Sequence, residues 1–326
     1  MTGETGPVFV RRRNSGRGMD DKRFTIGRLQ IRATDGLILT TLAFLSLLTF
    51  LSGRRVEHGL ILVLKNIGVA SAYILFIYFS ERTNPKFWKF MIRMGAILFL
   101  YAYLNVAVDK LQLIIHGHWL DGQVIGLERS IFGVQPTLWL QRFVSKPVTE
   151  WMMFSYVIYL VIFPLLSGVI FFLRNGAAVE DYFFTLGISN VLCDLCFALF
   201  PVAGPIAHMG SLYGVKLDGY FWTRTGEWLR SMQFVGGTIP SPHCANTTVM
   251  WMMAYRYHRP SFWMISPVVL SLFMATIYCR YHYVTDSILG MAAGFFVFFT
   301  APRLMDLWDG IVDLTKNWGS GFRDLS

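Results

Sequence analysis

Long apolar runs, separated by short polar segments, occupy the chain from residue 36 to residue 301. A helix needs about 20 mostly apolar residues to cross a bilayer, so runs of this kind predict transmembrane helices. The pattern is that of an all-α polytopic membrane bundle with about eight transmembrane helices. The predicted spans are 36–53, 60–79, 94–108, 152–173, 182–202, a shorter run after His243, 263–279 and 287–301.

The composition also indicates a membrane protein. Hydrophobic residues make up 54% of the chain and charged residues only 15%, whereas soluble domains carry about 25% charged residues. The first 35 residues are polar and basic, and we expect that they are not a signal peptide, because the apolar run after them is long enough to span. We expect residues 1–35 to be a basic cytoplasmic tail, disordered or lying on the membrane surface, with no nucleic-acid partner. Residues 36–93 should hold two N-terminal transmembrane helices.

Basic residues in short loops indicate the cytoplasmic side of a membrane protein. With eight spans, the N-terminal tail and the loops 81–93, 174–181 and 255–261 all fall on that side. The arginine pair in the first turn is an exception. Both termini are therefore expected in the cytoplasm, the second as a tail over residues 303–326.

The opposite face receives two histidine motifs. GGTIPSPHCANTT (236–248) ends a long loop that begins at residue 203, and YCRYHYVTDSILG (278–290) forms the turn before the last span. A further long segment, 117–150, lies on the same side. We expect this face to meet the periplasm, the cell exterior or an organelle lumen, and the two motifs to converge there.

The second of these motifs places His282 and Asp286 four residues apart, which puts them on one face of a helix. Burying such groups is costly unless they are paired or reach water, so function is a better reason for them than stability. A carboxylate at this spacing can accept the Nδ1–H of the ring. The other nitrogen is then free to act as a nucleophile.

In the first motif, Gly236 and Gly237 permit a tight turn, and Pro240 and Pro242 suit the start of a helix. His243 would then lie at a helix N-terminus, where backbone N–H groups favour an anion. It can protonate a leaving oxygen as a general acid. The two motifs together predict phosphoryl transfer through a phosphohistidine, a mechanism that needs no metal and no cofactor.

The segments PSPH and RYHYVTDSILG resemble the motifs of the type-2 phosphatidic acid phosphatase superfamily, which carry PSGH and, about forty residues later, SR…H…D. His243 and His282 are 39 residues apart with one helical hairpin between them. The resemblance implies a phosphatase-like catalytic membrane domain over residues 94–302 with a six-helix core. It also implies that His282 is the nucleophile, His243 the acid and Asp286 the residue that orients the nucleophile.

Two departures from that pattern are informative. The phosphatases carry an arginine where this chain has Thr276, and their first motif, a lysine followed by Arg-Pro, has no match before SPHC. The chain is more similar to the inositol phosphorylceramide synthase and sphingomyelin synthase branch, also in segments 119–140 and 200–205. This branch implies transfer of a phospho-headgroup from a phospholipid to a lipid alcohol such as ceramide. The alternative is a lipid phosphate phosphatase that uses the same residues with water as acceptor.

Other residues are candidates for substrate binding, each with a structural alternative. Arg280 can hold phosphate or reach the headgroup region as a helix-end arginine, and His208 faces the correct side without a partner in sequence. Two acidic residues, Asp121 and Glu128, can bind a polyol headgroup or a divalent ion, although a solvated interfacial helix is the preferred interpretation. The remaining candidates, which can equally cap or pack, are Ser241, Asn246 and Thr247.

Other classes of protein remain open. Two histidines on facing helices can ligate haem iron or another metal, and charges within apolar runs occur in lipid transporters. The CxxC pair at Cys193 and Cys196 favours small buried residues over a metal or redox site, since no second CxxC or histidine pair accompanies it. The oligomeric state is open.

Overall fold

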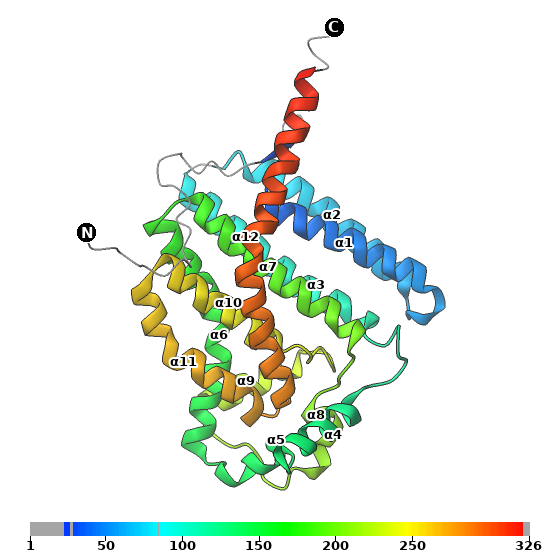
Figure 1. The fold of residues 1–326 in the computed structure, drawn as a ribbon, viewed down its shortest axis with the longest axis vertical. Helices are drawn as coiled ribbons and strands as arrows, with labels where there is room; N and C mark the ends of the chain where they lie inside the picture. The colour runs from blue at the N-terminus through cyan, green and yellow to red at the C-terminus, as the bar shows by residue number, and fades with distance from the viewer. Residues whose placement is uncertain (1–22, 27–28, 84, 322–326) are drawn as a thin grey trace, which may run out of the picture.

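The computed structural model describes residues 23–26, 29–83 and 85–321. The long helices of the described chain form a bundle (Figure 1). In chain order they are α1 (Ala33–Ser52), α2 (Gly59–Ser80), α3 (Lys86–Val108), α6 (Lys146–Leu173), α7 (Gly176–Leu199), α10 (Pro242–Tyr257), α11 (Arg259–Tyr278) and α12 (Val284–Gly321).

Seven of these described helices are long and apolar enough to cross a membrane. The eighth, α10, has 16 residues and packs against α6, α7, α11 and α12. The chain is therefore an all-α polytopic membrane protein, as predicted. The helix bounds differ from the predicted spans at two places: α3 begins within the segment expected as the loop 81–93, and α12 continues through the expected tail as far as Gly321.

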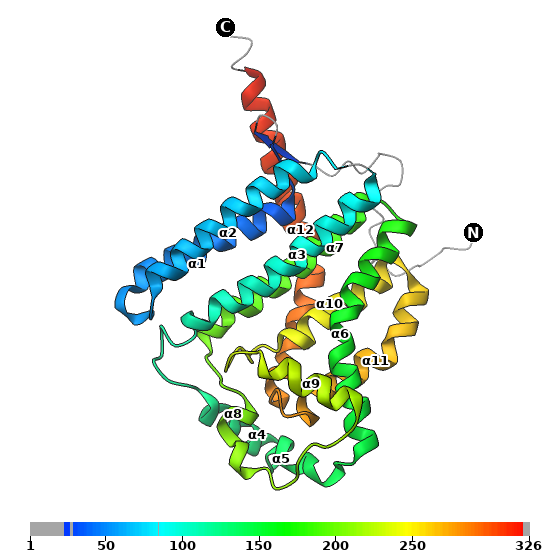
Figure 2. The same cartoon turned by 180° about the vertical axis from the view of Figure 1, so that it is seen from behind.

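Short helices fill the connections at one end of the bundle, which we call the site end. Figures 1 and 2 show α4 (Asp121–Phe132), α5 (Pro136–Trp139), α8 (Pro205–Met209) and α9 (Phe221–Ser231) gathered there, opposite the C-terminal end of α12. The connections from α3 to α6, from α7 to α10 and from α11 to α12 all lie at this end. The 3-10 turns are η1 (Gly53–Arg55), η2 (Asp109–Leu111), η3 (Leu140–Phe143) and η4 (Gly210–Leu212).

A short hairpin precedes α1. Strands β1 (Phe24–Ile26) and β2 (Leu29–Ile31) pair antiparallel. The Arg23 guanidinium donates to Gln30 at 2.6 Å and to Glu81, in the α2–α3 connection, at 3.2 Å. This part of the expected tail is thus attached to the bundle, while residues 1–22 and 27–28 lie outside the described residues.

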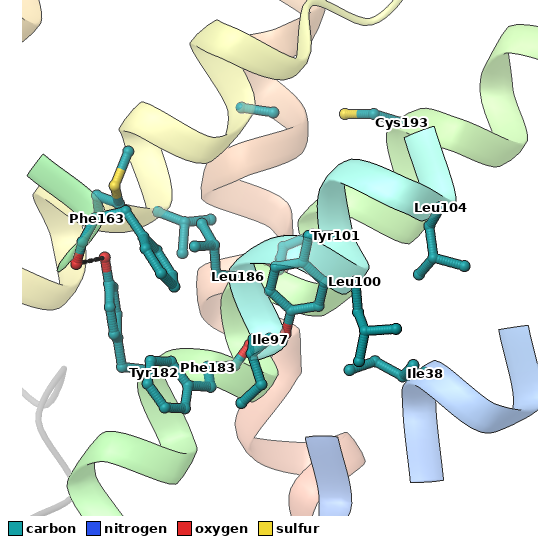
Figure 3. Close-up of a cluster of buried hydrophobic side chains, with 14 of the residues drawn as sticks. Ile38, Ile97, Leu100, Tyr101, Leu104, Phe163, Tyr182, Phe183, Leu186 and Cys193 are labelled. Atoms are coloured by element: carbon teal, nitrogen blue, oxygen red, sulfur yellow. Dashed lines mark hydrogen bonds between the residues drawn. The ribbon is translucent and has the colours of Figure 1, made fainter. Parts of the chain in front are cut away.

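The apolar core is built around α7, the most buried of the seven candidate spans. Figure 3 shows its Tyr182 and Phe183 packed against Phe163 of α6 and Tyr101 of α3. The two tyrosine hydroxyls donate to backbone carbonyls, Tyr101 to Phe183 at 2.6 Å and Tyr182 to Phe163 at 3.4 Å. Buried hydroxyls are thereby satisfied inside an apolar core.

A group of buried charges joins α1 and α2 to that core. The Arg93 guanidinium, on α3, bonds Asp35 of α1 at 2.8 Å and Glu180 of α7 at 3.0 Å, and the Tyr73 hydroxyl of α2 donates to Asp35 at 2.6 Å. All three charged side chains are at most 7% exposed. Buried charges require partners of this kind, which explains why Arg93 lies inside a helix rather than in the expected basic loop.

Candidate active site

The PSPH segment forms the first turn of α10. Ser241 caps the helix, because its Oγ accepts a hydrogen bond from the backbone N–H three residues later at 3.3 Å. Pro242 occupies the first helical position, where no N–H is needed. Gly236 and Gly237 precede it with φ angles of 98° and 66°, a region that suits glycine. His243 thus lies at the start of a helix, behind a glycine turn.

His282 lies in the turn between α11 and α12. The N–H groups of Tyr281 and His282 both donate to the Thr276 carbonyl at 3.0 Å, which closes α11 in a Schellman-type arrangement. Arg280 takes the left-handed conformation that this turn requires, with φ 66°. That conformation costs a non-glycine residue about 1 kcal/mol, and strained residues of this kind cluster at functional sites.

The close crossing of α10 and α12 brings the two motifs together. A Cβ on Gly290 would lie 2.5 Å from the Ser241 carbonyl oxygen, and Gly294 makes an equally close approach one turn later. As a result, the ring centroids of His243 and His282 are 5.7 Å apart, with the ring planes at 58°. One phosphorus atom placed between two rings at this separation can be within reach of both.

Two tyrosines of α6 hold the His243 ring. Tyr156 stacks on it with a centroid distance of 4.5 Å, and Tyr159 lies tilted against it at 5.2 Å. The Tyr156 hydroxyl is 3.5 Å from Nδ1 of His243. Among the described residues Nε2 has no hydrogen-bond partner, so it is available to a substrate.

Asp286 lies in the first turn of α12, on the predicted side of the His282 ring. Its Oδ2 accepts a hydrogen bond from Tyr283 N at 2.9 Å and lies 3.6 Å from Nδ1 of His282. The second distance is longer than a hydrogen bond. The carboxylate can stabilise a charged ring at this range, and a shift of about 0.5 Å would complete the expected Nδ1–H bond.

Burial sets the protonation state of the candidate nucleophile. It lowers the pKa of His282 from 6.5 to about 4, although a hydrogen bond to the Thr238 backbone acts in the opposite direction. The imidazole is therefore neutral at neutral pH. A nitrogen lone pair is then available for attack.

A cavity of about 490 Å³ extends from the two histidines between α3, α6, α7 and α10. Its walls are mostly apolar and include Leu98, Leu160 and Phe163. Polar groups are confined to a few places, as in most small-molecule sites. The volume and the apolar walls suit a lipid.

A family model describing the PAP2 superfamily matches residues 122–300, more than half of the chain. The chain belongs to the PAP2 superfamily. A search of curated proteins and a search of solved structures each return no match. Membership in the PAP2 superfamily indicates a lipid enzyme of the phosphatase or phosphotransferase type, and the matched segment contains both histidine motifs.

Thr276, which stands where PAP2 phosphatases carry an arginine, is a packing residue in this chain. It is fully buried, and its hydroxyl is hydrogen-bonded to Phe273 O at 2.8 Å and lies 2.9 Å from Ser287 Oγ. Its carbonyl holds the turn that carries His282.

Two arginines, Arg230 and Arg280, line the cavity of this PAP2 protein. Arg280 lies over the Tyr213 ring at 4.2 Å and donates to the Val215 carbonyl at 2.5 Å. Burial lowers its pKa, against the opposing effect of Tyr213. Arg230, on α9, pairs with Glu227, and its Nε is buried without a partner among the described residues. Sequence reasoning missed Arg230, which lies in a segment without a recognised motif, although the strongly amphipathic pattern of α9 was a usable signal.

The remaining predicted binding residues divide into two groups. Asn246 lines the cavity, one turn from His243. Ser241 and Thr247 are buried within the helix packing and do not line it. His208 is exposed on α8 and also lies outside the lining, so the structure does not bring it to the histidines.

The two acidic residues of α4 are buried rather than solvated, which corrects the preferred interpretation. Asp121 accepts hydrogen bonds from Ala203 N at 2.8 Å, from Gly204 N at 3.0 Å and from the Tyr283 hydroxyl at 2.9 Å. Glu128 accepts from Thr285 N at 2.8 Å, at the start of α12. Their carboxylates therefore fix the loops on both sides of the site.

Proposed function

We propose that this PAP2 protein is a lipid phosphotransferase that moves a phospho-headgroup from a phospholipid to a lipid alcohol through a phosphohistidine. The observation that carries the proposal is the approach of His243 and His282 to 5.7 Å at one wall of a lipid-sized cavity. Family membership supports the reaction class. The resemblance to the inositol phosphorylceramide and sphingomyelin synthases supports transfer.

In the first step, the lone pair on Nε2 of His282 attacks the phosphorus of the donor. Burial lowers the pKa of His243 to about 3, so the ring takes up its proton when the anionic phosphate binds beside it. The N–P bond then forms as the bond from phosphorus to the glyceride oxygen breaks, and His243 gives that proton to the oxygen. Diacylglycerol leaves. Asp286, 3.6 Å from Nδ1, stabilises the positive charge that develops on the ring.

In the second step, the acceptor hydroxyl attacks the same phosphorus. His243, now neutral, takes the hydroxyl proton while the O–P bond forms and the P–N bond breaks, which restores both histidines. Water in place of the lipid alcohol gives hydrolysis by the same route. Arg230 and Arg280 are placed to hold the phosphate oxygens, and Arg230 has an uncommitted Nε for this purpose.

The cationic groups favour a phosphodiester over a phosphomonoester as substrate. A diester carries one negative charge and a monoester nearly two, and the lysine and arginines that grip a monoester in the phosphatases have no counterpart in the motifs. Among the described residues, Arg230 and Arg280 are the cationic side chains of the cavity lining. The alternative, a lipid phosphate phosphatase, keeps the same catalytic residues.

The remaining expectations follow from this assignment. Residues 94–302 form the catalytic membrane domain, 36–93 two added helices, and both termini lie in the cytoplasm, so that the site end faces the periplasm, the exterior or a lumen. The basic loops support this orientation. Cysteine labelling from one side, at positions in α9 and in the α10–α11 turn, would test it.

Product analysis tests the reaction itself. Purified protein is given headgroup-labelled phospholipids with and without a lipid alcohol such as ceramide. Transfer predicts a new labelled lipid and free diacylglycerol, with both lost in His282→Ala. Inorganic phosphate as the sole labelled product from a monoester would establish the phosphatase instead.

A further inference from the structure

A polar wall lies beside the two histidines in the cavity and is not used by the proposed chemistry. Three asparagines line it: Asn105 from α3, Asn190 from α7 and Asn246 from α10. Polar residues within transmembrane helices are costly, and they are a functional-site hypothesis by default.

Asn246 has an unpaired acceptor. Its Nδ2 donates to Asn190 Oδ1 at 2.9 Å and to the Tyr159 hydroxyl at 3.3 Å. Its Oδ1 has no hydrogen-bond partner among the described residues, although the side chain is 2% exposed. A buried carbonyl oxygen of this kind normally has a donor. Since Asn246 lines the cavity, a ligand can supply that donor.

Asn105 presents a second acceptor. Its Nδ2 donates to Asp194 Oδ1 at 3.0 Å, and among the described residues no hydrogen bond uses its Oδ1. Asp194, behind it, is 2% exposed, and its Oδ2 also lacks a partner in the described chain. Asp194 is therefore a positioning residue for Asn105, which lines the cavity.

The two hydrogen-bond acceptors, the side-chain oxygens of Asn105 and Asn246, lie at nearly the same depth in the bundle as the histidines. Asn190 and Asp194 are four residues apart on α7, so they occupy adjacent turns of one face. Because α7 and α10 run in opposite directions and Asn190 meets Asn246, Asp194 lies one turn nearer the site end. Asn105 is thus at about the depth of His243, with Asn246 one turn further in.

We propose that this asparagine wall binds the acceptor lipid, and that the acceptor carries at least one hydrogen-bond donor in addition to the hydroxyl that reacts. The inference rests on the proposed transferase function. On this proposal the cavity has two parts. The arginines and histidines bind the phosphate in one part, and the unpaired oxygens of Asn105 and Asn246 bind a neutral group in the other. A second hydroxyl or an amide N–H satisfies them. An anion would be repelled by these oxygens, so a phosphate belongs at the other side.

A pair of acceptors that differ by one donor tests this proposal. The first is an N-acyl amino alcohol with a primary hydroxyl, and the second is its N-methyl amide, which lacks the N–H. A second pair of acceptors tests the other type of donor: one member carries a second hydroxyl, and in the other this hydroxyl is replaced by its methyl ether. For the wild type we expect kcat/KM for the acceptor to fall about tenfold or more on methylation in at least one pair, because the asparagine oxygen is left unpaired.

Variants then test which residues cause the preference for the acceptor with the additional donor. Asn105→Leu and Asn246→Leu should reduce the tenfold preference to threefold or less. The ratio between the two members of each pair is the readout, because any change in the donor chemistry affects both members equally. Asp194→Asn should keep part of the preference, because an amide oxygen still accepts from Asn105. Asn66→Leu is the matched control. Asn66 is also a buried asparagine in a membrane helix, bonded to Tyr103 at 2.8 Å, and it lies outside the cavity.

The outcomes separate the two proposals. Equal transfer to both members of each pair overturns the inference and leaves the transferase function intact. Equal loss of preference in Asn66→Leu also overturns it, because the effect would then be one of helix packing. A wild type that transfers to no alcohol, and releases only the phosphorylated headgroup or inorganic phosphate, overturns the transferase function and this inference with it.

Discussion

Gly290 controls how closely α12 approaches α10. A Cβ at this position would lie 2.5 Å from the Ser241 carbonyl oxygen and 2.9 Å from Cys244 Cβ. Neither neighbour is the end of a flexible side chain, so neither can rotate away. Substitution of Gly290 by alanine must therefore move one helix relative to the other.

The size of that movement follows from the distances. An ordinary Cβ contact begins at 3.4 Å, so the crossing must open by about 0.9 Å, and overpacking of this kind costs about 1–3 kcal/mol of folding free energy. His282 lies two residues before α12, and His243 lies in the first turn of α10. A displacement of about 1 Å at reacting groups can lower a rate about 100-fold. We expect Gly290→Ala to fold, to melt at a lower temperature and to lose about two orders of magnitude in kcat.

The assay is single-turnover release of diacylglycerol from a labelled donor, with thermal unfolding followed on the same detergent-solubilised samples. Gly168→Ala is the control. Gly168 also lies within a membrane helix, α6, and no atom comes within 4 Å of an added Cβ. It should keep wild-type activity. Full activity in Gly290→Ala, or an equal loss in Gly168→Ala, would refute the argument that this crossing sets the distance between the histidines.

Further predictions concern the catalytic and structural residues. Alanine at His243 or His282 should abolish turnover in folded protein, whereas Asp286→Asn should leave a trace, because the amide still contacts the ring; turnover with unchanged melting checks this. With a pKa of about 4, the ring of His282 stays neutral far below pH 6.5, so an NMR titration of its labelled ring should show protonation only towards pH 4, and a transition centred near 6.5 would contradict the burial argument. Arg280→Gly should relieve the left-handed strain and keep or raise the melting temperature while raising the KM for donor, whereas unchanged KM would remove the arginine from the phosphate site. Arg93→Met leaves two buried carboxylates without their cation and should cost about 3–5 kcal/mol, measured as lost yield of folded protein; wild-type yield would contradict the pairing.

Apolar periodicity was sufficient to predict most of the fold. It gave the eight helices and their alternating direction, and the direction alone brought His243 and His282 to the same end of the bundle. The prediction of helix bounds failed where charged residues lie inside a helix. Arg93 looked like part of a basic loop because its partners, Asp35 and Glu180, are distant in sequence, and a buried ion pair between distant segments leaves no local pattern.

The site was predictable where its chemistry follows a motif and not where it follows packing. The spacing of His282 and Asp286 indicated their proximity, although the 3.6 Å separation is longer than the hydrogen bond expected. Asp121 and Glu128 looked solvated because α4 mixes apolar and charged residues, yet their partners are backbone N–H groups of other loops. Such partners cannot be identified from residue types alone.

The buried charges of α1, α3 and α7 have a consequence for how the chain is inserted into a membrane. Asp35 enters first, and Arg93 follows two helices later, so an early intermediate holds a neutral pair. Glu180 arrives at the start of α7, after one further span, when the same arginine is already in place. A chain shortened to begin at α3 would still keep Arg93 beside Glu180 as a neutral pair. Removal of the first two helices would therefore leave neither of these two residues as an unpaired charge. In the order of synthesis, Arg93 is thus the common partner of both carboxylates, first of Asp35 and then of Glu180.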